Sequence, residues 1–250
     1  MTEGGVAVLL PILDEEEALP GTLSAIPRHP ALAEVVVVDN GSRDRSAQVA
    51  AAHGATVVTE PQRGYGSACL AGIAHLASRP VPPQVVAFVD GDGRGQAAYL
   101  EALLRPILEG EADLSLGSRI PPEHGSGLKV PWHQRTGNRL VLVLVRILFG
   151  HRFQDFAPFR AIRMERLQEL EMDDRTWGWT VQMQLRALVR GLRIAEVPIP
   201  HSGRTEGKSK ISGTFRGSVK AGAKMIFTVV RERFRTTGRG PPGGRARPGM

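Results

Sequence analysis

The chain has 250 residues, 42% hydrophobic and 23% charged, and is long enough to bury a core within one large domain or two small ones. Its single cysteine, Cys69, excludes an internal disulfide. The last 50 residues hold 12 Lys and Arg against 2 acidic residues, whereas the first 200 hold 20 against 23. This basic end favours a phosphate-bearing partner or an anionic membrane, and the slightly acidic remainder argues against nucleic acid.

Strands and helices are predicted to alternate through the first half. Nothing like a signal peptide precedes the first apolar run at Val6, which favours a cytoplasmic location. Val-rich runs typical of strands buried on both faces of a parallel sheet lie at residues 6–10, 35–39, 55–58, 85–90 and 113–117. Helical apolar spacing fills the gaps at residues 16–26, 44–53, 67–77 and 97–108. The pattern predicts a doubly wound α/β fold.

The second half contains two segments whose surroundings the sequence leaves open. The run LVLVLVRILF at 140–149 is shorter than the ~20 residues of a spanning helix but too apolar for a solvated face, so we expect it to be buried or to lie on lipid. Residues 219–230 carry an apolar stripe beside lysines, which fits either a helix at an anionic membrane surface or core packing with a basic edge. The stripe consists of Val219, Ala223, Ile226 and Val230. Peripheral contact with the inner face of a membrane therefore stays open.

The C-terminal segment 235–250 is rich in Pro, Gly and Arg and has almost no apolar residues. Such a composition cannot build a core, so we expect a disordered basic tail. Residues 1–234 then form a single domain.

Three polar clusters follow predicted strands: PILDEE after the first, DNGSRD after the second and DGDGR after the fourth. Each alone is typical of a capped turn. Ligands of doubly wound sheets bind at the carboxyl ends of the strands, where helix N-termini point their amides at anions. Three clusters at such ends therefore favour a shared ligand site.

Two carboxylates, Asp90 and Asp92, stand one residue apart at the end of the fourth strand. Such a pair can bind Mg²⁺ or Mn²⁺ together with the oxygens of a diphosphate. A DxDG sequence also begins haloacid-dehalogenase-type phosphatases, with the first Asp as nucleophile and the second as acid or base. We rank this alternative lower, because Arg94 stands where that motif has Thr or Val and the motif usually opens the fold.

The stretch RGYGSACLAG at 63–72 lacks the third glycine of a dinucleotide-binding motif and follows the third strand rather than the first. Its glycines still allow a backbone to approach a phosphate or sugar closely, and tight helix packing explains them equally well.

The order of PILDEE, VVVVDNGSRDRS, RGYGSACLAG, FVDGDG, LSLGSR, RTGNRL, DFAPFRAIR and GKSKISGT resembles family 2 glycosyltransferases of the dolichyl-phosphate mannose synthase-like group, which have the GT-A fold. The resemblance covers about residues 5–230. It implies a mostly parallel sheet flanked by helices. It further implies a metal-dependent, inverting transfer from a UDP- or GDP-linked sugar, most often to a polyprenyl phosphate.

The resemblance also implies roles for individual residues. The donor-binding set consists of Pro11, Leu13, Glu15, Asp39, Gly64, Asp90, Gly91 and Arg94. Asp90 and Asp92 match the family's metal-binding motif, and Asp92 is also expected to be a catalytic residue. The family's binding site for the acceptor phosphate is matched by Arg119, Arg135, Lys208 and Lys210, which are basic side chains of the kind that bind phosphate. Arg119 is also expected to act in catalysis.

Asp155 in the segment QDFAPFR has two interpretations. A phosphate acceptor is already a nucleophile at neutral pH and needs no strong base, whereas a hydroxyl acceptor needs a positioned carboxylate or histidine. The resemblance makes Asp155 the candidate base for a hydroxyl acceptor. The alternative is a structural role, in which Asp155 bridges Arg160 or a backbone turn.

Overall fold

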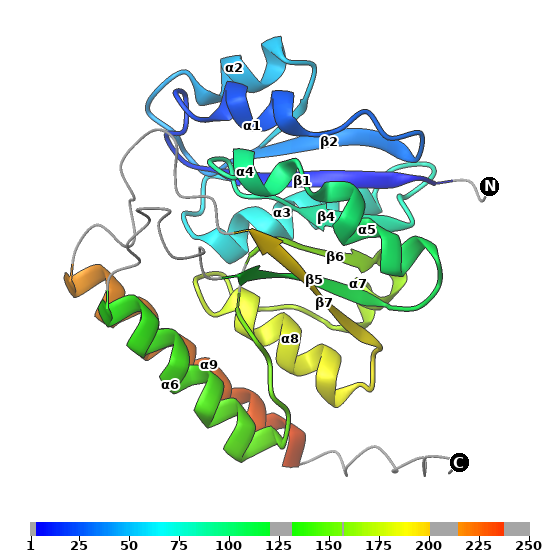
Figure 1. Ribbon diagram of the computed structural model, residues 1–250. Coiled ribbons are helices and arrows are strands. Elements are labelled where there is room, and N and C mark those ends of the chain that lie inside the picture. Colours follow the sequence, from blue (N-terminus) through cyan, green and yellow to red (C-terminus); the bar gives the residue numbers. More distant parts are fainter. Residues whose placement is uncertain (1–3, 121–131, 157, 201–214, 238–250) are drawn as a thin grey trace.

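The computed structural model describes residues 4–120, 132–156, 158–200 and 215–237 (Figure 1). The strands are β1 (Val6–Ile12), β2 (Leu32–Asp39), β3 (Thr56–Thr59), β4 (Val85–Phe88), β5 (Leu114–Ile120), β6 (Arg160–Arg163) and β7 (Ile194–Pro200). The helices are α1 (Leu19–Ala25), α2 (Ser46–Ala52), α3 (Tyr65–Ala77), α4 (Arg94–Ala97), α5 (Leu100–Leu108), α6 (Trp132–Phe149), α7 (Met164–Glu169), α8 (Trp179–Val189) and α9 (Phe215–Thr237).

The strands form one sheet in the order β3-β2-β1-β4-β6-β5-β7. β1 pairs in parallel with β2 and β4, β2 with β3, and β5 with β7, whereas β6 is antiparallel to both of its neighbours. The chain winds outward from β1 in both directions, so the topological switch point lies between β1 and β4. Because β6 runs the other way, the residues before it lie at the same edge as the carboxyl ends of β4 and β5.

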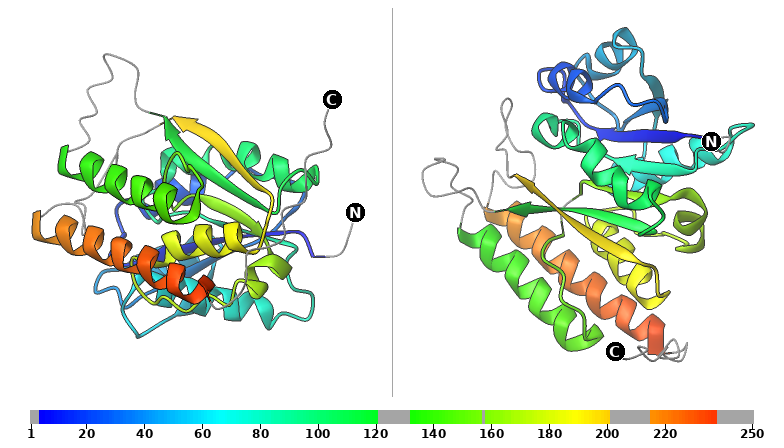
Figure 2. Two further views of the ribbon diagram at one scale, coloured as in Figure 1. Left: turned by 90° about the horizontal axis from the view of Figure 1, so that it is seen from below. Right: turned by 45° about the vertical axis from the view of Figure 1, so that its right-hand side comes forward.

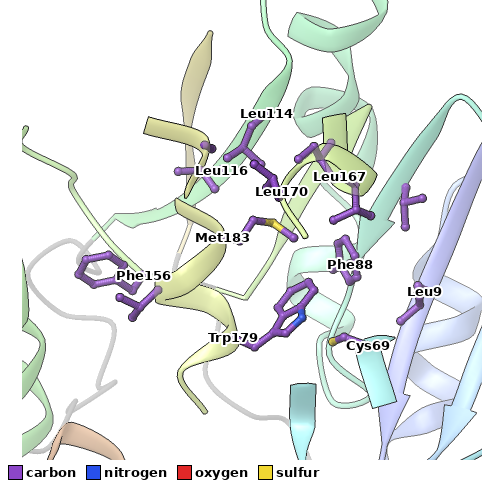
Figure 3. Packing of buried hydrophobic residues seen from close by; sticks show 14 of the residues in the cluster. Leu9, Cys69, Phe88, Leu114, Leu116, Phe156, Leu167, Leu170, Trp179 and Met183 are labelled. Carbon is purple, nitrogen blue, oxygen red and sulfur yellow. The ribbon is translucent and has the colours of Figure 1, made fainter. Parts of the chain in front are cut away.

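Alternate residues of each strand enter two separate cores, as the pleat of a strand requires. Ala7 and Leu9 of β1 pack with α3, α7, α8 and the helix pair α6 and α9, whereas Val8 and Leu10 pack with α1, α2, α4 and α5. In the first core the Trp179 ring packs against Phe88 with ring centroids 4.9 Å apart (Figure 3). The result is a three-layer α/β sandwich.

The predicted alternation of strands and helices is confirmed, with shifted boundaries. The helix expected at residues 97–108 begins earlier and divides into α4 and α5, and β6 and β7 did not follow from the sequence pattern. The last helix extends to Thr237, three residues into the segment expected to be a tail. Arg235 holds this last turn, because its Nη1 lies 2.7 Å from Oδ2 of Asp173. Residues 238–250 lie outside the described part of the chain.

α6 and α9 lie side by side along one side of the molecule and run in the same direction (Figures 1 and 2). Val141 and Val145 of α6 and Val229 of α9 are buried against the first core. The stripe expected on α9 is not its buried face, because Val230 is 36% exposed and the buried positions are Thr228, Val229 and Glu232. None of the helices in the described ranges has the length and apolar character needed to span a bilayer.

Candidate active site

The three polar clusters meet at the carboxyl edge of β2, β1 and β4, as predicted. The backbone N–H of Asp14 donates to the Ser42 hydroxyl at 2.9 Å, and Oδ1 of Asp14 accepts from the N–H of Arg43 at 2.6 Å. A Cβ placed on Gly91 would lie 3.3 Å from Cγ of Glu15. The residues expected to bind the sugar donor that follow β1, β2 and β4 therefore lie together at the carboxyl edge of the sheet.

Pro11 and Asp39 belong to the paired strands themselves. Pro11 is buried beside Val38, and Ile12 lies opposite Asp39 in the β1–β2 ladder, with Leu13 directly after it. Oδ1 of Asp39 accepts from the N–H of Ser42 at 2.9 Å and so fixes the start of the following loop. The expected role of Asp39, a hydrogen bond to the base or ribose of the nucleotide donor, stays a prediction.

Gly64 is held at this edge by Asn40, the residue after β2. The Asn40 side-chain amide donates to the carbonyl oxygens of Glu60 and Gln62 at 2.9 and 2.8 Å, and its Oδ1 accepts from the Gly64 N–H at 2.7 Å. Gly64 has φ of +144°, and a Cβ there would overlap the carbonyl oxygen of Arg175. The glycine is therefore required by its backbone conformation and by close packing, which is one of the two expected explanations.

Asp90 and Asp92 lie on the turn after β4, in which the Gly93 N–H donates to the Asp90 carbonyl at 2.8 Å. Oδ1 of Asp90 is buried and accepts no hydrogen bond from a described residue. Burial and then the nearby charge of Asp92 raise the pKa of Asp90 to about 7. A half-buried carboxylate with one unpartnered oxygen beside a second carboxylate fits a cation, since a bound positive charge compensates both.

The described residues contain no group of three or more His, Cys, Asp and Glu side chains that could hold a metal. Two carboxylates nevertheless suffice for Mg²⁺ or Mn²⁺, because such ions normally complete their coordination with water and substrate phosphate oxygens. The acidic pair therefore fits a metal that binds together with a diphosphate.

A buried cation, Arg160, lies behind the acidic pair. It lies opposite Phe88 of β4 and Leu116 of β5, and its guanidinium donates to the carbonyl oxygens of Pro158 at 3.2 Å and Thr180 at 2.9 Å. Burial lowers the pKa of Arg160 to about 10. Its positive charge opposes the rise in the pKa of Asp90, as does that of Arg119.

Tyr65, the first residue of α3, is partly buried on the same side, with its hydroxyl fully buried, and packs its ring edge against Trp179 with the ring centroids 6.1 Å apart. Burial, together with the nearby Asp90, raises the pKa of Tyr65 far above its usual value, so its hydroxyl stays protonated. Neither Tyr65 nor Arg160 is predicted at the site from the sequence. The only local features that distinguish them in the sequence are that Arg160 stands within an apolar run and that Tyr65 stands between two glycines.

Arg119 and Asp155 form a two-pronged ion pair at the same edge. Nε of Arg119 lies 2.6 Å from Oδ2 of Asp155, and Nη2 lies 2.8 Å from Oδ1. Oδ1 also accepts from the Phe156 N–H at 2.8 Å. Burial disfavours the charged carboxylate, but hydrogen bonds and charge from Arg119 outweigh burial and hold the pKa of Asp155 below its usual value.

This geometry favours the structural interpretation of Asp155. Its carboxylate pairs with the Arg119 side chain and accepts from the backbone at Phe156. A carboxylate held in this way is a poor base. The fork leaves Nη1 as the Arg119 nitrogen without a partner in the described chain, and the Arg119 side chain is 37% exposed. Arg119 can therefore accept an anion on its remaining side.

The turn that carries Asp155 is supported from two elements. The Gln184 side chain of α8 donates to the Asp155 carbonyl at 3.0 Å. Glu196 of β7 accepts from the Gln154 N–H and from the Ser118 hydroxyl, both at 2.9 Å. Neither Gln184 nor Glu196 is predicted at the site from the sequence, because no local sequence pattern distinguishes them.

Four of the expected binding residues cannot be placed. The side chains of Arg94 and Arg135 lie outside the described part of the structure, as do Lys208 and Lys210 entirely. Their roles in phosphate binding stay predictions.

The sheet order and the acids at its switch point define a GT-A fold. The fold resembles crystal structures of glucosyl-3-phosphoglycerate synthase from Mycobacterium tuberculosis, one of them a complex with Mn²⁺, UDP and glucosyl-3-phosphoglycerate. That comparison has a TM-score of 0.73 at 22% identity and covers 92% of this chain and 80% of the other.

Sequence comparison is more specific than the fold. Residues 7–170 match the model of glycosyl transferase family 2. An uncharacterized glycosyltransferase of Mycobacterium tuberculosis is 43% identical over 88% of this chain and 96% of its own length. A dolichyl-phosphate hexose transferase of Haloferax volcanii is 33% identical over 92% and 96%, and an undecaprenyl-phosphate mannosyltransferase of Micrococcus luteus is 31% identical over 85% and 89%.

The chain belongs to glycosyl transferase family 2. Nothing in the comparisons supports the phosphatase alternative.

Proposed function

We propose that this protein transfers a sugar from a UDP- or GDP-linked donor to a polyprenyl phosphate, with inversion at the anomeric carbon. Relatives named for dolichyl-phosphate and undecaprenyl-phosphate acceptors support the acceptor class. The observation that carries the proposal is the placement of Arg119 at the same edge as Asp90 and Asp92. The acids suit a metal-bound diphosphate, and the arginine suits an incoming phosphate.

In the proposed reaction an acceptor phosphate oxygen forms a bond to the anomeric carbon while the bond from that carbon to the donor diphosphate breaks. The nucleoside diphosphate leaves, and one displacement inverts the configuration. A phosphate monoester is already anionic at neutral pH, so no strong base is needed. The ion-paired state of Asp155 is consistent with this.

The chain's own residues then position the reactants and compensate charge. Asp90 and Asp92 would hold Mg²⁺ or Mn²⁺, which would supply positive charge to the leaving diphosphate. Nη1 of Arg119 binds the acceptor phosphate and reduces the repulsion between the two anionic reactants. Arg160 adds a fixed positive charge behind Asp90.

A thermal-shift panel of UDP- and GDP-sugars, with and without Mn²⁺, tests donor binding. A donor at 100 times its Kd adds about 2.7 kcal/mol to the free energy of unfolding. For a chain of this size, this raises the Tm by roughly 5–11 °C. We expect such a rise with one nucleotide class in the presence of Mn²⁺, and its loss in Asp92→Asn.

Acceptor choice is tested by incubating the responding donor with a polyprenyl phosphate, the matching polyprenol and a sugar alcohol. We expect product with the phosphate only. If every nucleotide sugar leaves the Tm unchanged, the proposed donor class is wrong. If the donor binds but only hydroxyl acceptors react, the acceptor class is wrong and Asp155 must be reconsidered as the base.

A further inference from the structure

The outward sides of α6 and α9 carry a ridge of exposed apolar side chains. On α6 these are Leu140, Val143 and Ile147, which are 55%, 46% and 73% exposed. On α9 they are Phe227, Val230 and Phe234, which are 57%, 36% and 74% exposed. We call these six side chains the outer ridge.

Spacing places the ridge opposite the buried face of each helix. Both sets follow the pattern i, i+3, i+7, which lies on one side of an α-helix. Val141 and Val145 of α6, and Thr228 and Val229 of α9, occupy the other side and are buried. The two helices lie side by side (Figures 1 and 2), and the exposure of the six side chains shows that both ridges face away from the core.

The charges on the two helices are almost entirely positive. α6 contains three arginines and no acidic residue, and α9 contains six Lys and Arg and one acid, Glu232. Glu232 is 4% exposed and pairs with Arg186 at 2.9 Å, so it adds no negative charge to the outer surface. Arg139 and Arg146 of α6 are exposed and form no ion pair with a described residue.

An apolar ridge beside Arg139 and Arg146, two exposed arginines without an ion pair in the described chain, is complementary to an anionic lipid surface. On α9, Lys224, Arg231 and Arg235 are held in ion pairs with Asp173 and Asp174, so the free charge next to the ridge comes from α6. Apolar side chains enter the boundary between headgroups and acyl chains, and arginines remain among the lipid phosphates. A second copy of the chain fits less well, because two such helix pairs would bring like charges together. The first turns of both helices also lie on the side to which β5 and β7 point, the side of Arg119 (Figure 2).

We propose that the outer ridge of α6 and α9 is a docking surface that binds the protein to a bilayer containing anionic lipid. This inference goes beyond the proposed function, because binding is measured without donor or acceptor. It predicts that α6 and α9 lie along the bilayer surface.

Vesicle co-sedimentation tests the surface. The full chain should bind phosphatidylglycerol–phosphatidylcholine vesicles at low salt and bind more weakly at 0.5 M salt, because screening shortens the range of the arginine charges. The variant Ile147→Ser/Phe234→Ser should lose about tenfold or more in partition coefficient. A matched control, Val81→Ser/Leu108→Ser, removes two exposed apolar side chains elsewhere and should bind like the wild type.

A second variant separates charge from apolar contact. Arg139→Gln/Arg146→Gln should weaken binding to anionic vesicles about 30-fold and leave weak binding to pure phosphatidylcholine unchanged. Circular dichroism and Tm check that each variant is folded. The proposal is overturned if the wild type does not sediment with anionic vesicles. It is likewise overturned if Ile147→Ser/Phe234→Ser and Arg139→Gln/Arg146→Gln both bind as tightly as the wild type. It is also overturned if the ridge holds a dimer in solution that Ile147→Ser/Phe234→Ser dissociates.

Discussion

Asp155→Asn tests whether the fork between Arg119 and Asp155 positions the arginine. The substitution keeps the shape of the side chain but removes its charge and replaces one acceptor oxygen by an NH₂ group. One prong of the fork is then lost, and the Arg119 guanidinium can turn away from the place where the acceptor phosphate binds. We expect kcat to fall while binding of the nucleotide donor stays unchanged.

The magnitude follows from burial and geometry. Removing one partner of a fully buried ion pair costs about 3–5 kcal/mol. The Arg119 side chain is 37% exposed, so water solvates much of the uncompensated charge, and we expect a loss of about 1–2 kcal/mol in the free energy of unfolding. Misplacement of a charged group by about 1 Å costs roughly 100-fold in rate, equivalent to about 2.7 kcal/mol.

A second fork in the same protein supplies the matched control. Arg193 and Asp113 form the same pairing, with Nε to Oδ2 at 3.1 Å and Nη2 to Oδ1 at 2.8 Å, at the opposite end of β5 from Arg119. Asp113→Asn should lower stability without lowering kcat. The assay is transfer of labelled sugar to polyprenyl phosphate, with Tm measured on the same samples.

Arg119→Lys completes the test, because lysine cannot form the fork. The effects of Arg119→Lys and Asp155→Asn on kcat should not add in the double variant, since both break one unit. An unchanged kcat in Asp155→Asn refutes positioning by the fork. Additive losses, together with disappearance of the acidic limb of the pH–rate profile in Asp155→Asn alone, would instead identify Asp155 as the base.

Three further predictions concern the support of the donor side. Gly66→Ala should lower the free energy of unfolding by about 1–3 kcal/mol in urea titrations, because its Cβ would overlap the Asp174 carbonyl oxygen, whereas Gly222→Ala in open space on α9 should not. Asn40→Ala should weaken nucleotide-sugar binding in the thermal-shift assay, because it frees the Gly64 loop; unchanged binding would contradict this. Asp174→Asn should destabilise the protein more at pH 7 than at pH 3. Burial raises the folded pKa of Asp174, but pairing with Lys224 together with hydrogen bonds from Thr176 outweighs burial and lowers that pKa. The contribution of Asp174 therefore exists above the unfolded pKa of about 3.9 and is lost as pH falls through the folded value. An equal loss at both pH values would contradict this assignment.

The sequence predicts the parallel half of the fold because its signals are local. The Val-rich runs of β1, β2 and β4 identify buried strands, and the acids that follow them lie at the carboxyl edge once the strands are parallel. Asp90 and Asp92 are therefore recognisable without a structure. The electrostatic surroundings of Asp90 are not, since Tyr65 and Arg160, which both lower its pKa, come from distant parts of the chain.

The antiparallel strand β6 escapes such reasoning for a physical reason. It is four residues long and begins with Arg160. This charged side chain can be fully buried because the backbone carbonyls of Pro158 and Thr180 accept hydrogen bonds from its guanidinium. No local pattern distinguishes such an arginine from a solvated one. Without the direction of β6, the pairing of Arg119 with Asp155, 36 residues apart, does not follow from the sequence.

The segment 173–178 connects the donor edge to α9. Its Arg175 carbonyl accepts from the N–H of Ser67 at 3.1 Å, beside the glycines that open α3. One residue earlier, Oδ2 of Asp174 lies 2.9 Å from Nζ of Lys224 on α9, and Asp174 is 2% exposed. At the other end, a Cβ on Gly178 would overlap Oγ1 of Thr228. The same short backbone therefore supports α3 at the donor edge and the inner side of α9, so a shift of α9 cannot occur without displacing the atoms against which Gly64 and Gly66 pack.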